Sequence, residues 1–110
     1  MFKSEEELVR VSIDLNRVIC EVLVLVQGTL QRQDIIVRTE LDEMLSPVTG
    51  SPVQLQQVLF NLVSNAIEAM ESAAERVILI KTKLGENREI HVAVEDSGSG
   101  IEQNFLRSQA

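Results

Sequence analysis

The chain has 110 residues, of which 45% are hydrophobic and 25% charged, and its formal net charge is −7. This length and apolar share fit one globular domain with a real core. The negative charge argues against nucleic acid or anionic lipid as the main partner, because both are polyanions. The longest apolar run covers residues 22–26, far short of the ~20 residues that cross a bilayer. Because no charged-then-apolar leader opens the chain either, we expect a soluble, cytoplasmic protein without membrane contact by this segment.

The N-terminal residues predict a tail and one short strand. Residues 1–7 are polar, and the alternation of Val9, Val11 and Ile13 within residues 8–13 is typical of a strand. We therefore assign residues 1–13 to an N-terminal tail with a short strand and residues 14–110 to the domain itself.

A helix is expected from Leu15 to about Arg32, with Asp14 as its N-cap. The β-branched run at residues 22–26 would also fit a strand, although no turn signal precedes Gly28. Cys20 is the single cysteine, so an internal disulfide is excluded, and its apolar surroundings in the sequence predict a buried structural thiol.

The middle of the chain predicts a strand, a loop and a well-defined helix start. Residues 35–41 alternate between apolar and polar positions, as in a half-buried strand, and residues 42–50 read as a loop. Ser51, Pro52 and Gln54 then form a capping-box arrangement, with serine as N-cap, proline at the first helical position and glutamine at the third.

The central helix, residues 54–70, carries two distinct rows of side chains. Its expected core-facing residues fall within an arc of about 120°; they are Leu55, Val58, Leu59, Leu62, Ala66, Ala69 and Met70. Beside them runs a row of amides with one charge: Gln54, Gln57, Asn61, Asn65 and Glu68. Asn61 and Asn65 are i,i+4 neighbours. Together they can present two carbonyl oxygens to a hydrated Mg²⁺, which prefers oxygen ligands.

Two strands close the predicted domain. Residues 77–84 and 89–96 alternate in strand fashion and are joined by the short polar loop 85–88, as in a hairpin. Asp96 then stands at the end of a strand, where its carboxylate can accept a hydrogen bond from an exocyclic amine. Gly98 and Gly100 let backbone lie against a flat base. The order of strands and helices predicts an α/β fold, a two-layer sandwich of helices on a mixed sheet.

Two segments resemble motifs of sensor histidine kinases. NLVSNAIEA is similar to their asparagine-rich box, and VEDSGSGI to their first glycine box. The architecture is shared with gyrase, mismatch-repair and chaperone ATPases. The resemblance implies ATP and Mg²⁺ as cofactors, with Asn65 holding the metal and Asp96 receiving the adenine amino group. It implies a nucleotide-binding set of Asn61, Asn65, Asp96, Gly98, Gly100 and Ile101.

The resemblance also implies an activity. Family members of this type transfer the γ-phosphoryl group of ATP to a histidine on a separate dimerisation domain, upstream of a response regulator, in two-component signal transduction. Hydrolysing relatives carry a glutamate one turn before the metal asparagine, whereas Asn61, an amide, cannot act as a general base. A hydrolysing relative of the gyrase type is therefore disfavoured. A non-catalytic partner-binding module that kept the fold stays open as an alternative.

No catalytic side chain is assigned in this chain. His91 lies in a predicted strand and not on an acidic-flanked helix as the family's phosphate acceptor does, and Glu68 reads as a solvent-facing charge. No second glycine cluster follows Ile101, although Phe105 and Leu106 fit the start of a lid. We expect the C-terminal part of the fold to be missing, which would leave this fragment inactive alone.

A shortened fold should also expose sheet edges and apolar surface. We therefore expect the isolated chain to self-associate, through a sheet edge or through apolar residues left partly uncovered. The candidates for uncovered surface are Leu59, Leu62, Met70, Ile78, Ile80, Val92 and Val94.

Overall fold

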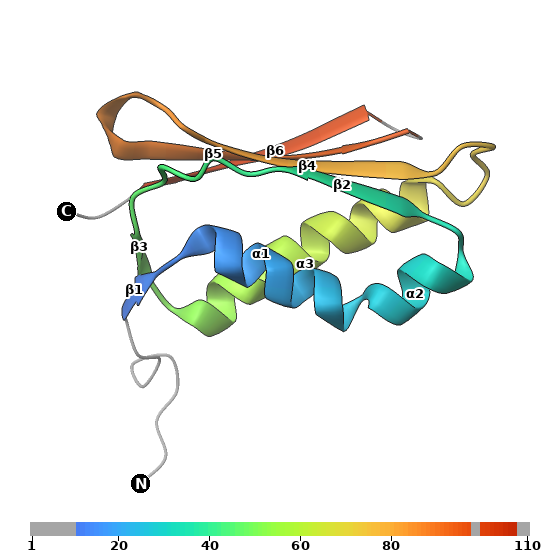
Figure 1. Cartoon of the computed structure of the whole chain (residues 1–110), viewed down its shortest axis with the longest axis horizontal. Helices are drawn as coiled ribbons and strands as arrows, with labels where there is room; N and C mark the ends of the chain where they lie inside the picture. Colours follow the sequence, from blue (N-terminus) through green and yellow to red (C-terminus); the bar gives the residue numbers. More distant parts are fainter. Residues whose placement is uncertain (1–10, 98–99, 108–110) are drawn as a thin grey trace, which may run out of the picture.

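A computed structural model describes residues 11–97 and 100–107 of the chain. The helices of the described residues lie beneath the main sheet, so that the molecule has two layers (Figure 1). The elements in chain order are β1 (Val11–Ile13), α1 (Leu15–Leu25), α2 (Gln27–Arg32), β2 (Ile36–Glu40), β3 (Val48–Gly50), α3 (Pro52–Ala69), β4 (Val77–Leu84), the 3-10 turn η2 (Glu86–Arg88), β5 (Glu89–Asp96) and β6 (Gly100–Arg107).

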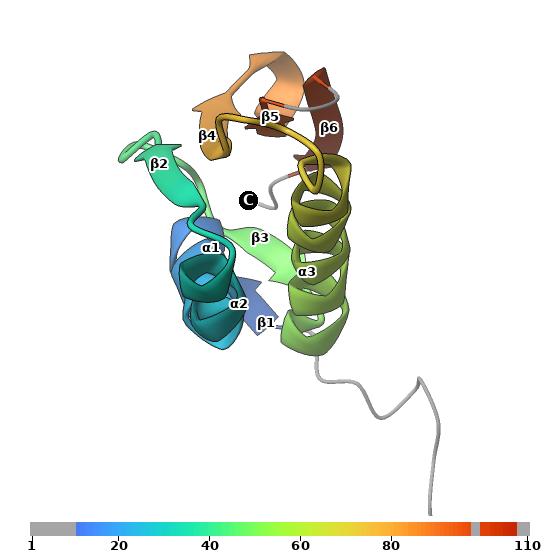
Figure 2. The same cartoon turned by 90° about the vertical axis from the view of Figure 1, so that its right-hand side faces the viewer.

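The main sheet is mixed, as predicted. Its strand order is β2-β4-β5-β6, with β2 parallel to β4 and the other neighbours antiparallel. Parallel neighbours need a crossover connection, which α3 supplies here between β2 and β4. Seen along the helices, α1 and α3 lie side by side under the sheet (Figure 2). The expected fold class, a two-layer α/β sandwich, is confirmed.

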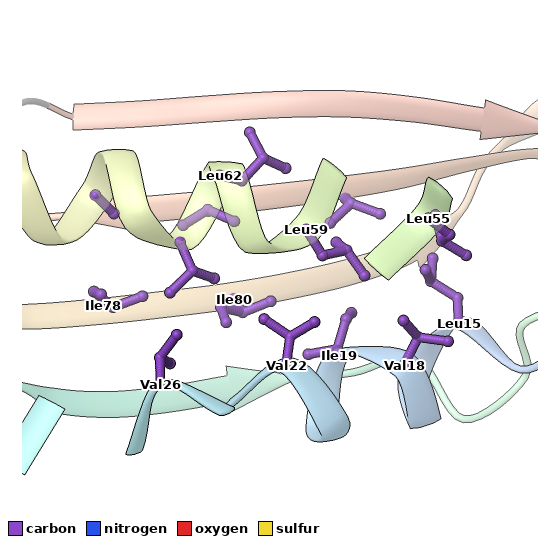
Figure 3. Packing of buried hydrophobic residues seen from close by; sticks show 14 of the residues in the cluster. Leu15, Val18, Ile19, Val22, Val26, Leu55, Leu59, Leu62, Ile78 and Ile80 are labelled. Atoms are coloured by element: carbon purple, nitrogen blue, oxygen red, sulfur yellow. The ribbon is translucent and has the colours of Figure 1, made fainter. Parts of the chain in front are cut away.

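The core lies between the sheet and these two helices. Leu15, Ile19 and Val22 of α1 meet the stripe of α3 and the inner face of β4 and β5 (Figure 3). All seven residues that we expected to be partly uncovered are buried: Leu59, Leu62, Met70, Ile78, Ile80, Val92 and Val94. That expectation was wrong because α1 and α3 together cover the inner face of the sheet.

The first predicted helix is broken in two. Residues 22–26 are helical up to Leu25, so the alternative strand is excluded, but α1 ends there and α2 begins at Gln27. Val18, Val22, Val26 and Leu30 are all buried at intervals of four residues. Such a row drifts by about 40° per step around a straight helix. The break at Val26 brings the later members of the row back to the core.

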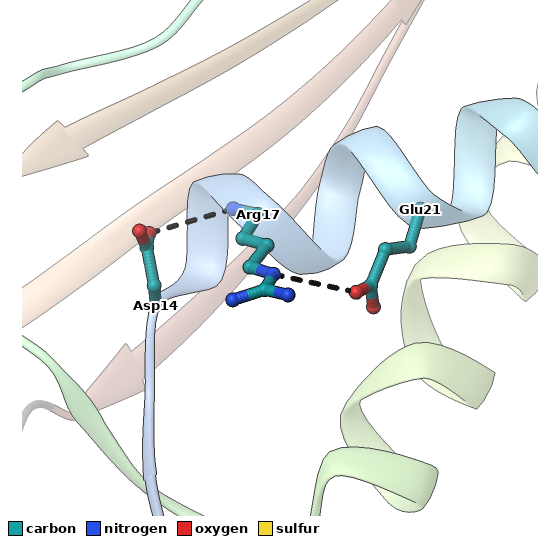
Figure 4. Close-up of polar contacts among 3 residues, drawn as sticks. All are labelled: Asp14, Arg17 and Glu21. Carbon is teal, nitrogen blue, oxygen red and sulfur yellow. Dashed lines mark hydrogen bonds and ion pairs between the residues drawn. The ribbon is translucent and has the colours of Figure 1, made fainter.

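Both long helices begin where the sequence predicts. The Ser51 hydroxyl accepts a hydrogen bond from the Gln54 N–H at 3.3 Å, and Pro52 occupies the first turn of α3. Asp14 accepts from the Arg17 N–H at 3.4 Å at the start of α1, where Arg17 also pairs with Glu21 at 3.6 Å (Figure 4). This exposed ion pair contributes little, because solvent screens it.

Three further expectations need correction. β3 lies within the expected loop 42–50 and pairs antiparallel with β1, Val11 opposite Gly50. β6 covers Phe105 and Leu106, where we expected a lid to begin, and it pairs antiparallel with β5. Cys20 is exposed and not buried, because it lies on the side of α1 that faces away from the core.

Candidate nucleotide-binding site

The amide row of α3 faces solvent. Its five members are all exposed: Gln54, Gln57, Asn61, Asn65 and Glu68. The buried stripe is turned slightly from the predicted one, because α3 packs against α1 as well as against the sheet. Val63 and Ile67 are buried, whereas Val58 is 38% exposed and Ala69 is half-buried. Asn61 and Asn65 therefore stand together on an accessible face, one turn apart.

Asp96 is the last residue of β5, as expected. It is half-buried and lies opposite Ile78 of β4 and Gly100 of β6 in the strand register. Since successive residues of a strand point to opposite faces, Asp96 lies on the same face as the buried Val92 and Val94. The carboxylate thus comes from the helix-covered side of the sheet, at the end of the strand.

Ser97 fixes this strand end to the turn that follows α3. Its hydroxyl donates to the Glu75 carbonyl oxygen at 2.6 Å and accepts from the Val77 N–H at 3.2 Å. It also lies 3.4 Å from the sulfur of Met70, the C-cap residue of α3. The end of β5 is held against the C-terminal end of α3 by these contacts.

An open hollow of about 700 Å³ lies at this junction. Its lining residues come from the end of α3, the following turn and the end of β5; they are Ala69, Ser72, Ala73, Ala74, Glu75 and Ser97. Ala69 lies one turn beyond Asn65 on α3, and Ser97 follows Asp96 directly. Asn61, Asn65 and Asp96 do not line the hollow themselves, so the two motif-bearing elements meet there through their neighbours.

Arg76 holds the turn on its other side. Its guanidinium donates to the carbonyl oxygens of Glu71 at 2.7 Å, Ala73 at 3.3 Å and Gln33 at 3.0 Å. Three carbonyl acceptors suit the fixed fork of an arginine. Sequence reasoning missed this residue, since an arginine at the end of a polar turn gives no signal of its distant partner at Gln33.

The remaining candidate residues divide into described and undescribed positions. Gly98 lies outside the described residues, Gly100 begins β6, and the strand continues through Ile101. Within residues 11–97 and 100–107, no three acidic, histidine or cysteine side chains gather where they could hold a metal ion.

Charged residues lie on the outer face of the sheet, away from the helices. The Lys81 ammonium lies 2.8 Å from the Glu95 carboxylate. This hydrogen bond, together with the charge of Glu95, raises the pKa of Lys81. His91 lies 3.4 Å from Glu89 on the same face, in β5, as the strand prediction required.

A second polar cluster joins α1, the segment after β2, and β4. Thr82 is 5% exposed, and its hydroxyl donates to the Asn16 side-chain oxygen at 3.0 Å and accepts from the Asp42 N–H at 2.9 Å. The Asn16 amide donates in turn to the Asp42 carbonyl oxygen at 2.9 Å. The Asp42 carboxylate accepts from the N–H groups of Met44 and Leu84, which lowers its pKa. The sequence did not reveal this cluster, because its members are far apart in the chain.

A protein-family model described as "Histidine kinase-, DNA gyrase B-, and HSP90-like ATPase" matches residues 50–108. Sporulation kinase A of Bacillus subtilis (strain 168) is 30% identical over 104 residues, which are 94% of this chain and 17% of that protein. The signal transduction histidine-protein kinase AtoS of Escherichia coli (strain K12) is 37% identical over 97 residues, 86% of this chain and 15% of that protein.

Solved structures agree with these sequence matches. The nucleotide-free catalytic domain of histidine kinase ThkA is 31% identical, with a TM-score of 0.72 over 82% of this chain and 60% of that chain. ThkA in complex with the response regulator protein TrrA gives a TM-score of 0.70 at 31% identity, over 80% of this chain and 25% of that one.

The comparisons confirm that the chain resembles sensor histidine kinases. The chain spans 15 to 17% of the length of the two curated relatives described. In the described part of the chain, no helix combines the length and apolar character that a membrane crossing needs. Because the family model covers more than half of the 110 residues, the chain belongs to the family of histidine kinase-, DNA gyrase B- and HSP90-like ATPases.

Proposed function

We propose that this chain is the ATP-binding part of a sensor histidine kinase whose whole protein transfers the γ-phosphoryl group of ATP to a histidine on a separate dimerisation domain. The observation that carries the proposal is the junction of the two motif-bearing elements. The end of α3, after Asn65, and the end of β5, after Asp96, border one open hollow through Ala69 and Ser97. The names of the two relatives, a sporulation kinase and a signal transduction histidine-protein kinase, support the same conclusion.

Asp96 is proposed to select adenine. Its half-buried carboxylate at the strand end suits a hydrogen bond from an exocyclic amino group. Such a bond is stronger where water is partly excluded. The segment of Gly98, Gly100 and Ile101 is proposed to lie beside the base, because its two glycines have no side chains and let the backbone approach the base.

Asn65 is proposed to hold the Mg²⁺ of Mg·ATP, with Asn61 one turn before it. Both amides are exposed on α3 and carry the oxygen donors that this cation prefers. The bound nucleotide would supply the transferable phosphoryl group and further oxygen ligands. A chain of net charge −7 can bind the anionic nucleotide only if metal, backbone amides or a few placed cations cover the phosphates, which gives the metal role of Asn65 some support.

The residue at position 61 favours phosphotransfer over hydrolysis. An asparagine side chain has no basic group to activate water. Phosphoryl transfer between positioned groups depends mainly on orientation and charge neutralisation. The acceptor would be a histidine outside this chain, because His91 lies on the outer face of the sheet beside Glu89, away from the helical layer.

The proposed partners follow from this role. They are ATP, the histidine-containing dimerisation domain of the parent protein and a downstream response regulator. The complex of the similar kinase ThkA with TrrA supports the last of these. We place the domain in the cytoplasm, where ATP and response regulators meet. A non-catalytic module that kept the fold is the second candidate; it would be favoured if a longer protein containing this segment also lacked a second glycine-rich segment.

Binding of Mg·ATP tests the proposal in two proteins. The 110-residue chain should bind weakly and show no kinase or ATPase activity, because phosphate contacts worth roughly 1.5–3 kcal/mol each are lacking. In a longer protein that contains this segment, Asn65→Ala should weaken Mg·ATP about tenfold or more, whereas the exposed Gln57→Ala on the same helix should not. Micromolar affinity of residues 1–110 in calorimetry would contradict the first expectation, and normal Mg·ATP binding by Asn65→Ala the second.

The isolated chain is also proposed to self-associate. The helices cover the inner face of the main sheet, and among the described residues its open edges are β2 and β6, so we propose that association uses one of these edges. Edge strands present unpaired N–H and C=O groups that can pair with another chain. The net charge of −7 opposes association only weakly, because salt screens it within about 8 Å.

A further inference from the structure

β2 presents a row of outward-pointing backbone groups. The Ile36 N–H donates to the Arg76 carbonyl oxygen, so the backbone groups of Ile36 point toward β4. Because successive residues of a strand point their N–H and C=O groups to opposite sides, those of Val37 and Thr39, and of Leu41 just after the strand, point away from β4. Within the part of the chain that the structure describes, these outward groups meet no other strand.

Two opposite charges stand between these residues. Arg38 and Glu40 are both exposed, and they lie on the outer face of the sheet, in register with Leu79 and Lys81 of β4. The Lys81 ammonium is bound to Glu95. Neither Arg38 nor Glu40 forms a salt bridge with another residue among residues 11–97.

This sequence is self-complementary in one antiparallel register. Centred on Thr39, a second copy of β2 would put Arg38 opposite the Glu40 of the other copy, twice by symmetry. Val37 would lie opposite Leu41. In registers centred on Arg38 or on Glu40, two like charges would face each other. Like charges directly opposite on one face of a sheet are destabilising.

The hydrogen-bond pattern fits the same register. The Thr39 N–H and C=O groups of both copies would bond to each other, as would those of Val37 and Leu41. The pair of Arg38 and Glu40 would then be a non-hydrogen-bonded pair, in which side chains come closer together. Backbone pairing and charge pairing are thus satisfied at once.

We propose that β2 is a homophilic edge, through which two copies of this chain join antiparallel about Thr39 into one continuous eight-stranded sheet. This inference rests on the self-association proposed above and assigns it a surface and a register. It is independent of nucleotide binding, because β2 lies at the opposite edge of the main sheet from β6.

The flank of α1 adds apolar surface beside this edge. Asn16 bonds to Asp42, just beyond β2, and Cys20 lies one turn further along the same side of the helix. Cys20 is exposed, and Val24 is 69% exposed. Because an exposed thiol can also form an intermolecular disulfide, association must be measured under reducing conditions.

Charge exchange tests the register directly. Sedimentation velocity of the whole 110-residue chain over a concentration series, with reductant present, should show a monomer–dimer equilibrium. Arg38→Glu and Glu40→Arg should each lower the association constant about tenfold, because two like-charge pairs replace two attractive ones. The double variant should have an association constant within about threefold of the wild-type value, because the charges at positions 38 and 40 are exchanged and still pair with opposite charges. An equimolar mixture of the two single variants should form a heterodimer, although each alone is mainly monomeric.

A proline tests the backbone. Thr39→Pro removes an outward N–H that β4 does not use and should abolish the dimer, whereas Thr39→Val keeps the N–H and should dimerise normally. Circular dichroism checks that each variant folds. If Thr39→Pro does not fold, the charge variants alone test the proposed register. A chain that is monomeric at every concentration would overturn both self-association and this register. A dimer that resists all β2 variants would overturn the register alone and point to β6 or to another strand.

Discussion

The Ser97 hydroxyl lies 2.6 Å from the Glu75 carbonyl oxygen and donates a hydrogen bond to it, so the residue after Asp96 is fixed to the turn after α3. Ser97→Ala removes this bond and the acceptor of the Val77 N–H. We expect a loss of about 1 kcal/mol in the free energy of unfolding, or about 4–8 °C in Tm. Thermal unfolding measures it. Ser72→Ala, a change in the same hollow, is the control and should leave Tm within about 2 °C of the wild-type value. Equal Tm shifts in the two variants would show that the Ser97 hydrogen bond contributes nothing specific.

Asp96→Asn tests the proposed contact with adenine. The variant keeps the size of the side chain but loses its charge, so adenine nucleotides should bind about tenfold more weakly in a longer protein that contains this segment. Folding should change little, because the group stands at the end of a strand. Calorimetry and thermal unfolding measure the two effects. Glu95→Gln is the control, since Glu95 pairs with Lys81 on the outer face and should not affect nucleotide binding. If Asp96→Asn binds adenine nucleotides normally but has a much lower Tm, Asp96 has a structural role and does not contact adenine.

Thr82→Val tests the polar cluster of Asn16, Asp42 and Thr82, which joins α1 to β4. The variant has nearly the same shape but leaves the Asp42 N–H and the Asn16 oxygen without their partner. Each hydrogen bond contributes roughly 0.5–1.5 kcal/mol net, so chemical denaturation should show a loss of about 1–3 kcal/mol for the two bonds. Thr39→Val on the exposed edge is the matched control and should change stability by less than about 0.5 kcal/mol. If both variants unfold alike, the hydroxyl of Thr82 contributes nothing specific.

Protonation of the Asp42 carboxylate in acid should lower the stability of the folded chain. Two backbone N–H groups, from Met44 and Leu84, lower its pKa in the folded chain below the ordinary value of 3.8. A depressed folded pKa stabilises the protein above the unfolded pKa, and the stabilisation is lost as pH falls through the folded value. Asp42→Asn keeps only one acceptor oxygen and does not titrate. The stability difference between the wild-type chain and Asp42→Asn should be constant from pH 7 to about 5 and shrink by about pH 3. A difference that is constant across this whole range would contradict the assignment.

Local signals in the sequence were enough for the long elements. Serine and proline place the start of α3, and a two-residue period gives β4 and β5, because these features depend on neighbours in the chain. β3 was missed, since its three residues form a strand only by pairing with β1 far earlier in the sequence. Cys20 was misplaced because the first helix has more apolar residues than its buried stripe can hold. The sequence pattern of this segment alone does not show which of its apolar residues face solvent.

The candidate site was predictable only in its parts. Spacing placed Asn61 and Asn65 on one face of a helix and Asp96 at the end of a strand, and the structure has them there. That the end of α3 and the end of β5 meet at one hollow depends on Ser97 and Arg76. Both reach their partners through long-range backbone contacts. No local pattern encodes such contacts.

The hairpin register has a consequence for changes in chain length. Asp96 lies opposite Ile78, and the pairing runs back to Leu84 opposite Ile90 at the turn. Extra residues inserted among residues 85–88 would lengthen only the turn and leave this pairing as it is. One residue inserted within β5 would instead move every side chain between the insertion and Asp96 to the opposite face. Natural variants and designed fusions should therefore vary in length at the turn, while the number of residues from Ile90 to Asp96 stays fixed.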